Sequence, residues 1–390
     1  MLRHESAILK PATNREFTKS RKWLDVPNPD VMGMGLADMD FQTAPSVIEA
    51  MKLRIEHGIF GYDQLPDFLI ETILNRLETL YDWKIEPEWI LLTSGIIPSL
   101  YAANRTIGKP HDDVITLTPT YGEIMNSVLK ADQNLVKVGM IQENNHWVID
   151  FDTLEKSITP STKVLNFCNP HNPIGRVYKR EELLRIIEIC NKYNIAISSD
   201  EVYADLILDE NKKHIPIASL DQQIAQNSIT HLSASKTFNL SGLRFSYTVI
   251  PNQQLRDKFI QNTSRILPGV NFIGAIATLS AYQYGEEWRK ELIEYLRVNR
   301  DLIYSYINNI PGLSVSKVEG TFLAWIDIRS LKLNNPVEFF AIHAKVLMLD
   351  GNEFSAPGYI RLNFGCETHK LEKALIGITQ AISSYREQIN

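Results

Sequence analysis

The chain has 390 residues, a net charge of −6 from 40 basic and 46 acidic side chains, and three cysteines. This length allows a large buried core and two domains, which is the size of an enzyme and not of a small binding module. The charges form neither a long run nor a basic stripe interleaved with aromatic residues, so nucleic acid is not expected as a partner.

The N-terminal stretch "MLRHESAILKPATNREF" is polar, and no run of about 18 apolar residues occurs anywhere in the chain. We therefore expect a cytoplasmic protein that does not enter a membrane. Cys168, Cys190 and Cys366 are scattered and form no CxxC pair. This spacing predicts buried reduced thiols, and neither a disulfide framework nor a metal site.

Short β-rich apolar runs alternate with helical patterns between about residues 90 and 250, which predicts parallel βαβ units. Apolar residues at helical spacing in 180–194 predict an amphipathic helix that covers one face of the sheet. The near-continuous apolar runs are typical of strands that are buried on both faces. The expected strands are residues 89–93, 113–118, 163–168, 195–200, 228–233 and 245–251.

The pattern changes after about residue 275 to a long charged helix, two strand-like runs and a last helix. These elements, expected at residues 285–310, 321–328, 359–364 and 369–385, predict a smaller α/β domain. The predicted fold is thus α/β, with a mostly parallel, doubly wound sheet in the large domain. The expected parts are an arm at 1–45 that joins the small domain, a large domain at 46–275 and a small C-terminal domain at 276–390.

Ligands of a doubly wound sheet bind in the loops that follow the carboxyl ends of the strands. After the first strand, "SGIIPSL" turns at Gly95 and is expected to open a helix at Pro98. The free amides of Ile96 and Ile97 at such a helix start could cradle a phosphate. An ordinary glycine turn with a proline at the helix start explains the same residues.

The next three strand ends carry an aromatic ring, an amide and an acid. Tyr121 in "PTYGE" could lie flat on a planar cofactor, or be a core aromatic. The turn "NPHNPIGR" could aim the amide of Asn172, held by Pro173, at a phenolate oxygen of a ligand. Asp200 could pair with a protonated ring nitrogen, or cap a helix.

The fifth loop, "SASKTFNLSGLR", places Lys236 where an apolar strand ends. A lone lysine is usually solvated, but one with a lowered pKa can attack a carbonyl and form a Schiff base. Ser233, Ser235 and Arg244 around it are suited to phosphate. A phosphate cradle, a flat aromatic, an amide, an acid and a lysine at successive strand ends are the parts that a pyridoxal 5'-phosphate site needs.

The ordered motifs resemble the fold-type I pyridoxal-phosphate enzymes of aminotransferase class I/II over nearly the whole chain. These motifs are "TSGIIPSL", "PTYGE", "NPHNPIG", "SDEVYADL", "SASKTFNLSGLR" and "YIRLNFG". The segments "LADMDFQTAPSVIEAM", "EHGIFGYDQLPDF" and "SKTFNLSGL" further resemble the cystathionine β-lyase, or cysteine-S-conjugate β-lyase, subgroup. The resemblance implies pyridoxal 5'-phosphate as the cofactor, an L-amino acid substrate and a homodimer with shared active sites.

The resemblance also implies roles for individual residues. Lys236 would bind the cofactor as a Schiff base and then shuttle protons, Asp200 would keep the pyridine nitrogen protonated, and Tyr121 would stack on the ring. The 3'-oxygen would be bound by Asn172 and Tyr203. The phosphate would be held by Ile96, Ile97, Ser233, Ser235 and Arg244, with Tyr62 reaching in from the second subunit. The substrate α-carboxylate would be bound by the fork of Arg361, with Asn172 and Ala37.

Two positions depart from the lyase pattern and leave the reaction open. The lyases typically have histidine at the position of Tyr203 and a residue other than arginine at Arg244, so both residues here are the aminotransferase choice. The framework favours side-chain elimination, as in a C–S lyase, whereas these two residues favour transamination. A specialised form of elimination is a dehydrating cyclase of a hydroxylated guanidino amino acid such as hydroxyarginine. Glu5 and Glu16 could then hold the cationic tail, or simply be solvated surface.

A third reading is a non-catalytic relative that serves as a regulatory domain. Such domains are attached to a DNA-binding helix-turn-helix, and the arm before residue 30 is too short to hold one. We therefore expect an enzyme.

Overall fold

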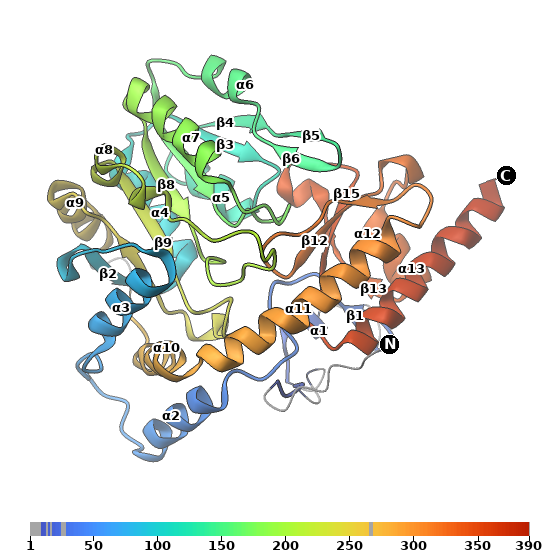
Figure 1. The fold of residues 1–390 in the computed structure, drawn as a ribbon, viewed down its shortest axis with the longest axis horizontal. Coiled ribbons are helices and arrows are strands. Elements are labelled where there is room, and N and C mark those ends of the chain that lie inside the picture. Colours follow the sequence, from blue (N-terminus) through green and yellow to red (C-terminus); the bar gives the residue numbers. More distant parts are fainter. Residues whose placement is uncertain (1–8, 13–14, 16–17, 25–28, 265–267, 390) are drawn as a thin grey trace.

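The computed structural model describes residues 9–12, 15, 18–24, 29–264 and 268–389. A large sheet lies between two layers of helices, and a smaller sheet lies beside it (Figure 1). None of the helices in this described part of the chain combines the length and apolar character that a membrane crossing requires.

The large sheet has seven strands in the order β2-β10-β9-β8-β7-β3-β4. Its strands are β2 (Ile90–Thr93), β3 (Asp113–Thr118), β4 (Asn134–Gly139), β7 (Thr162–Cys168), β8 (Ala196–Asp200), β9 (Ser228–Leu232) and β10 (Ser246–Val249). The six strands expected from the sequence are present, because buried apolar runs mark them. The sequence did not predict β4, an edge strand whose partly exposed, polar-interrupted pattern resembles that of a loop.

One strand direction in the large sheet differs from the expected series of parallel βαβ units. β10 runs antiparallel to both β2 and β9, whereas β9, β8, β7, β3 and β4 pair in parallel. A parallel connection needs a crossover of a dozen or more residues, usually a helix. Between β9 and β10 the chain forms only a turn and the short 3-10 helix Ser241–Leu243, so it returns in the opposite direction. The sheet is mostly parallel, as predicted.

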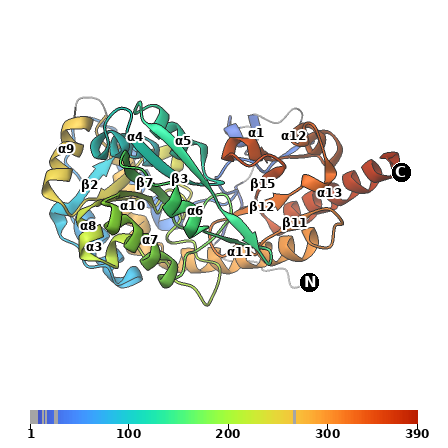
Figure 2. The same cartoon turned by 90° about the horizontal axis from the view of Figure 1, so that it is seen from above.

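Helices cover both faces of the large sheet (Figure 2). On one face α4 packs against α5 and α9, and α7 and α8 lie on the other face. The helices are α1 (Arg21–Leu24), α2 (Pro45–Glu56), α3 (Leu69–Tyr81), α4 (Ile96–Ile107), α5 (Gly122–Leu129), α6 (Phe151–Lys156), α7 (Arg180–Tyr193), α8 (Gln222–Gln226), α9 (Gln253–Thr263), α10 (Phe272–Tyr284), α11 (Glu286–Ile307), α12 (Pro336–Phe339) and α13 (Thr368–Ile389). The predicted amphipathic helix is α7, whose apolar stripe is buried against the sheet.

The small sheet is antiparallel, in the order β11-β12-β15-β14. Its strands are β11 (Ser314–Val315), β12 (Leu323–Asp327), β15 (Tyr359–Asn363) and β14 (Leu349–Asp350). The N-terminal strand β1 (Met32–Gly33) pairs with β13 (Val346–Leu347), so the first part of the chain contacts the C-terminal part. A hairpin of β5 (Ile141–Glu143) and β6 (His146–Val148) reaches toward β11, where Asn145 donates to the Val315 carbonyl at 3.0 Å. The domain boundaries stay a prediction.

A shared apolar core supports the region between the two sheets. The largest cluster of buried side chains includes residues from β9, β10, α10, α11, β12, β15 and α13. Within it the ring of Phe238, two residues after Lys236, stacks on Trp288 of α11 with centroids 5.6 Å apart. The turn that carries Lys236 is therefore anchored in packed core.

Candidate active site

Lys236 lies in the turn formed by residues 234–239, directly after β9. Its Nζ donates to the carbonyl of Ala37 at 2.9 Å, and its side chain is only partly exposed. Burial, together with the positive charge of Arg361, lowers the pKa of Lys236 to about 8. An amine with such a pKa has a far larger neutral fraction near neutral pH than an ordinary lysine, and this fraction can act as a nucleophile or a base.

Asp200 ends β8 and is 4% exposed. Its carboxylate accepts one backbone bond, from Val202 at 3.2 Å, and burial raises its pKa to about 6. A buried carboxylate normally accepts several hydrogen bonds or faces a cation. The remaining acceptor capacity of Asp200 fits a protonated ring nitrogen.

This raised pKa predicts how Asp200→Asn changes the stability of the cofactor-free protein. Between pH 4 and 6 the folded carboxyl binds more protons than the unfolded one, so the stability of the wild-type protein falls as pH rises through this window. With about 1.4 kcal/mol per pKa unit, Asp200→Asn should be more stable than wild type by up to about 3 kcal/mol above pH 6. The difference should vanish below about pH 4, as measured by urea unfolding at several pH values.

Asp205→Asn is a control of opposite sign. Asp205 is also buried, but it faces Arg76 at 2.8 Å, and that charge holds the pKa of Asp205 below its usual value despite burial. Its stabilising contribution is present at neutral pH and lost in acid. Asp205→Asn should therefore be less stable than wild type at neutral pH. A stability gain in Asp200→Asn that is independent of pH would contradict the burial of a charged Asp200.

Arg361 lies on β15 and is 2% exposed. Its two terminal nitrogens donate to Asn172 Oδ1 at 3.0 Å and to the Gly35 carbonyl at 2.9 Å. Its Nε has no hydrogen-bond partner among the described residues. Because a guanidinium has five N–H donors, three remain free, enough for a bidentate bond to a carboxylate. Asn172 keeps its NH₂ group as a donor for a ligand.

Two tyrosines close the site around Asp200 and Arg361. The hydroxyl of Tyr203 is buried and has no partner in the described part of the chain, so it is available to a ligand oxygen. Tyr121 is the residue before α5, and burial, with the nearby charge of Glu123, raises its pKa to about 12. Both tyrosines interact electrostatically with Asp200 and Arg361.

The start of α4 forms the expected anion cradle, with one correction. The helix begins at Ile96, two residues before Pro98, because Gly95 takes φ 114° and ψ 159° and turns the chain directly into it. A side chain is strained at this φ, so the position requires glycine. The first amides of a helix, here those of Ile96 and Ile97, lack partners within it and favour an anion.

Arg244 and two serines lie at or next to this cradle. The Arg244 Cα lies 4.0 Å from the position that a Cβ on Gly95 would take, and the side chain of Arg244 is exposed. The Ser94 hydroxyl, which sequence reasoning missed, is buried without a partner within the described residues. Ser233 donates to the Phe245 carbonyl at 2.7 Å and accepts the Ser235 amide at 3.0 Å. Its hydroxyl therefore supports the loop.

One described residue from the sequence predictions is not brought to this site within one chain. Tyr62 is fully exposed on the irregular segment after α2. Glu5 and Glu16 lie outside the described residues, so the idea of acidic partners for a cationic substrate tail is not tested.

The structure adds Asp38, which the sequence did not single out. Its carboxylate pairs with Arg15 at 2.8 Å, and its charge favours the protonated form of Lys236. Asp38 and Lys236 are far apart in sequence, and no local sequence pattern predicts that their charges interact.

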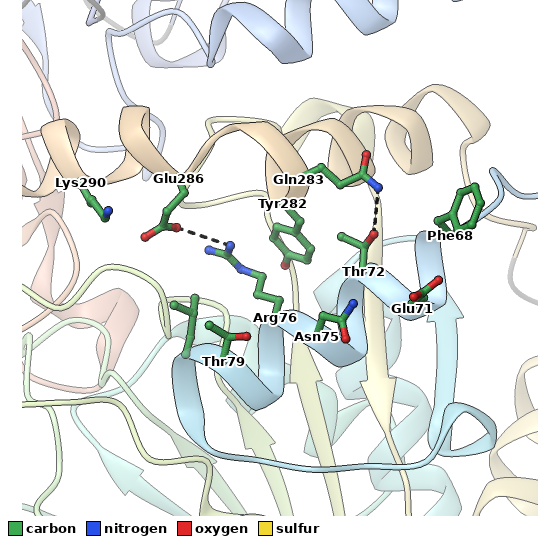
Figure 3. A pocket seen from close by; sticks show the side chains of 11 residues that line it. Phe68, Glu71, Thr72, Asn75, Arg76, Thr79, Tyr282, Gln283, Glu286 and Lys290 are labelled. Atoms are coloured by element: carbon green, nitrogen blue, oxygen red, sulfur yellow. Dashed lines mark hydrogen bonds and ion pairs between the residues drawn. The ribbon is translucent and has the colours of Figure 1, made fainter.

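A pocket of about 600 Å³ opens elsewhere, between α3, α10 and the start of α11 (Figure 3). The wall contains Arg76, which already pairs with Asp205 at 2.8 Å and faces Glu286 at 3.7 Å. Gln283 donates to Thr72 at 3.2 Å across it. None of the predicted site residues lines this pocket, so it is separate from the cluster around Lys236.

The cluster fits pyridoxal 5'-phosphate. A lysine of lowered pKa, an under-bonded buried acid, an unpartnered phenol and a helix start suited to an anion are the groups that the aldehyde, ring nitrogen, 3'-oxygen and phosphate of this cofactor would need. With a mostly parallel sheet, this set defines the class of fold-type I pyridoxal-phosphate enzymes.

Comparisons with known proteins agree with this class. The chain matches the model of the family "Aminotransferase class I and II" over residues 29–378, and it belongs to that family. It is 32% identical to cystathionine beta-lyase PatB of Bacillus subtilis, with 91% of this chain and 93% of PatB covered. It is 27% identical to a probable aspartate aminotransferase of Methanocaldococcus jannaschii, with 96% and 97% covered.

Solved structures are similar over nearly their whole length. OvoB superposes with a TM-score of 0.93 at 34% identity, covering 96% of this chain and 98% of OvoB. Cystalysin from Treponema denticola, whose structure contains pyridoxal 5'-phosphate, superposes with a TM-score of 0.91 at 28% identity, covering 98% and 100%. The resemblance found in the sequence is confirmed: the protein is a pyridoxal-phosphate enzyme similar to both C–S lyases and aminotransferases.

Proposed function

We propose that the protein eliminates a sulfur leaving group from the side chain of an L-amino acid. Whole-chain similarity to cystathionine β-lyase carries this proposal, with 32% identity over 361 residues. The bound cofactor supplies an electron-accepting ring that stabilises negative charge at the substrate Cα. The chain must then bind the substrate, remove one proton and supply another.

Arg361 binds the substrate α-carboxylate through its free N–H donors. The buried fork has three N–H groups left after its bonds to Asn172 and Gly35. Fixing the carboxylate orients the Cα–H bond toward Lys236, whose neutral amine takes the proton. Asp200 holds the ring nitrogen in its protonated form.

The leaving group departs from Cβ with the electron pair of the C–S bond. Tyr121, with a pKa raised to about 12, stays protonated and can donate a proton to the departing sulfur. A β-thioether amino acid and water thereby give a thiol, pyruvate and ammonia. Loss of a hydroxyl followed by ring closure, as in a cyclase of hydroxyarginine, is a variant of the same elimination. Apart from Asp200, the acid that acts on Lys236 among the described residues is Asp38, and Asp38 is already paired with Arg15.

Transamination is the second candidate. Tyr203 has a buried hydroxyl without a partner in the described chain, and the backbone of the exposed Arg244 lies beside Gly95 at the start of α4. Both residues are those of the aminotransferases in the resemblance, and a probable aspartate aminotransferase is a relative at 27% identity. The amino group would then stay on the cofactor while a keto acid is released.

Product stoichiometry separates the two candidates. The holoenzyme is given a thioether amino acid such as L-cystathionine without any keto acid, and ammonia, thiol and keto acid are counted per active site. The proposal predicts many equivalents of all three products. At most one equivalent of keto acid, with no ammonia and with the cofactor left in its amino form, would favour transamination and contradict elimination. A β-hydroxylated arginine converted to a cyclic product would establish the cyclase variant.

We further propose a homodimer in which Tyr62 serves the partner's phosphate site. Exposed large apolar side chains crowd into one short stretch, which is typical of an interface. They are Leu53, Ile55, Ile59, Phe60, Tyr62, Leu65 and Phe68.

Phe60→Glu tests the dimer, because Phe60 is 64% exposed and a charge there would be buried between subunits. We expect dimers for wild type and monomers with weakened cofactor retention for the variant, measured by sedimentation and absorbance. The control Ile376→Glu, 47% exposed on α13, should stay dimeric. A fully active wild-type monomer would contradict the shared site.

A further inference from the structure

The irregular backbone of residues 34–41 has an unusual set of bonds: each of its carbonyls accepts a hydrogen bond from elsewhere in the chain. We name these residues the carbonyl segment. The backbone amides of Asn363 and Ala12 donate to the carbonyls of Met34 and Asp40. Side chains donate to the other six carbonyls: Arg361 to Gly35, Asn363 to Leu36, Lys236 to Ala37, Asn363 and Lys22 to Asp38, Asn239 and Arg15 to Met39, and Asn239 to Phe41. The donors include the lysine and the arginine of the proposed mechanism.

Asn239 holds one end of the carbonyl segment to the lysine turn. Its NH₂ group donates to the carbonyls of Met39 and Phe41, both at 2.9 Å, and its Oδ1 accepts the Met39 amide at 3.0 Å. All hydrogens of the side-chain amide are thus used. Asn239 follows Lys236 by three residues and has φ 57°, a left-handed conformation that asparagine tolerates better than most residues.

Asn363 holds the other part of the segment to the Arg361 strand. Its NH₂ group donates to the carbonyls of Leu36 at 2.5 Å and Asp38 at 2.6 Å, and its Oδ1 accepts the Gly365 amide at 2.8 Å. The side chain is fully buried. Asn363 follows Arg361 by two residues on β15, so both side chains extend from the same face of that strand.

The hydrogen bonds from the two asparagines therefore lie next to those from Lys236 and Arg361 along the carbonyl segment. Lys236 donates to Ala37 at 2.9 Å, between the carbonyls held by Asn363, and Arg361 donates to Gly35 at 2.9 Å, next to them. A lysine side chain has many rotamers, and a fixed acceptor reduces them. Ala37 is the acceptor that the structure gives to the free amine.

We propose that Asn239 and Asn363 are positioning residues for the reaction. Asn239 ties the lysine turn to the Met39 and Phe41 carbonyls of the carbonyl segment, which also carries the Ala37 carbonyl that orients the free amine of Lys236 for proton transfer at Cα. Asn363 ties β15 to the Leu36 and Asp38 carbonyls, next to the Gly35 carbonyl that orients the fork of Arg361 for the substrate carboxylate. The inference rests on the roles proposed for Lys236 and Arg361, and it extends them to residues that touch neither substrate nor cofactor.

The two asparagines should affect different kinetic constants. Loss of the Asn239 amide misplaces the base, which slows proton transfer, because misplacement by about 1 Å can cost about 10²-fold in rate. Loss of the Asn363 amide misplaces the fork, which weakens binding of the carboxylate. A general loss of stability would change both constants together or neither.

The functional test follows hydrogen exchange at Cα of L-alanine in D₂O by NMR. L-Alanine has no leaving group, so its exchange reports proton transfer by the holoenzyme whether the enzyme eliminates or transaminates. Asn239→Gly, which keeps the left-handed backbone unstrained, should lower the maximal exchange rate about 10- to 100-fold and change the half-saturating concentration less than about 2-fold. Asn363→Ala should raise the half-saturating concentration about 10-fold.

The control is Asn299→Ala on α11. Asn299 is also fully buried and makes the same three kinds of bond: to the carbonyls of Phe364 at 3.0 Å and Cys366 at 2.8 Å, and from the Thr368 hydroxyl at 2.8 Å. It lies outside the carbonyl segment. Its loss should lower stability by an amount similar to that in Asn363→Ala, and it should leave both exchange constants within about 2-fold.

Amide hydrogen–deuterium exchange gives a second readout in the cofactor-free protein. Asn239→Gly removes the acceptor of the Met39 amide, so the peptide that covers residues 35–41 should exchange faster than in wild type or Asn299→Ala. Asn239→Asp keeps this acceptor and loses both donors. It should restore protection of Met39 while L-alanine exchange stays slow.

The roles proposed for the two asparagines and for Lys236 can each be contradicted by a specific exchange result. Equal effects of Asn239→Gly and Asn299→Ala on L-alanine exchange would overturn the positioning role of Asn239, even if Lys236→Ala is inactive. A change in the maximal rate alone for Asn363→Ala would overturn its assignment to the carboxylate site. If Lys236→Ala exchanged L-alanine as fast as wild type, or if wild type exchanged none, the proposed role of Lys236 would fail, and this inference with it.

Discussion

Lys236→Ala should lower the turnover number by about 10³-fold or more. General acid–base catalysis by a positioned side chain contributes about 10²- to 10⁴-fold, and this lysine is also the proposed covalent anchor of the cofactor. Its amine donates to the Ala37 carbonyl, and burial with the charge of Arg361 lowers its pKa to about 8 although Asp38 and Asp200 oppose this shift. Steady-state assay of the variant, reconstituted with excess cofactor, measures the loss.

Two further results test that this loss comes from the missing amine. A small primary amine added to the assay should restore part of the turnover, because it can enter the space that the side chain leaves. Lys163→Ala, which removes an exposed lysine bonded to the Pro160 carbonyl, should have wild-type activity. Turnover within 10-fold of wild type in Lys236→Ala would refute its role.

Arg361→Lys should lower kcat/KM by about 30- to 1000-fold, mostly through KM. Breaking a buried, hydrogen-bonded charge pair costs about 2–4 kcal/mol, and a tenfold effect corresponds to about 1.4 kcal/mol. A lysine is a point charge and cannot form two parallel bonds to a carboxylate. It would also lose the bonds to Asn172 and Gly35 that hold the guanidinium in place.

A substrate analogue distinguishes loss of carboxylate binding from general damage. The affinity for an amine that lacks the α-carboxylate should be nearly equal in wild type and Arg361→Lys. The change in cofactor absorbance on binding of the amine measures this affinity. Arg329→Lys changes an exposed arginine that pairs with Asp327 at 2.6 Å, and it should leave kcat/KM unchanged. An equal loss of affinity for the analogue and for the amino acid would contradict the proposed contact.

The fold was predictable where burial dominates the sequence. β3, β7, β8 and β9 are nearly continuous apolar runs, and each appears within one residue of its expected bounds. β4 was missed because an edge strand is half solvated and has no such run. The direction of β10 depends on a connection that holds only a turn and a short 3-10 helix, a tertiary feature that composition does not reveal.

The candidate site was predictable where a single residue sits at a strand end. Lys236, Asp200, Tyr121 and Asn172 all follow buried strands, and the edge of a parallel sheet brings such positions together. Asn363 was not predictable in the same way, because it bonds a carbonyl 327 residues away. The Tyr62 contact requires a second subunit, which one chain does not contain.

Lys236 is the proposed covalent anchor of pyridoxal 5'-phosphate, at the end of β9. Reduction of the holoenzyme with borohydride makes this bond permanent, and peptide mapping by mass spectrometry locates it. We expect one cofactor per chain, attached to the peptide that contains Lys236. Attachment to another lysine, or bound cofactor that borohydride does not fix to the chain, would contradict it.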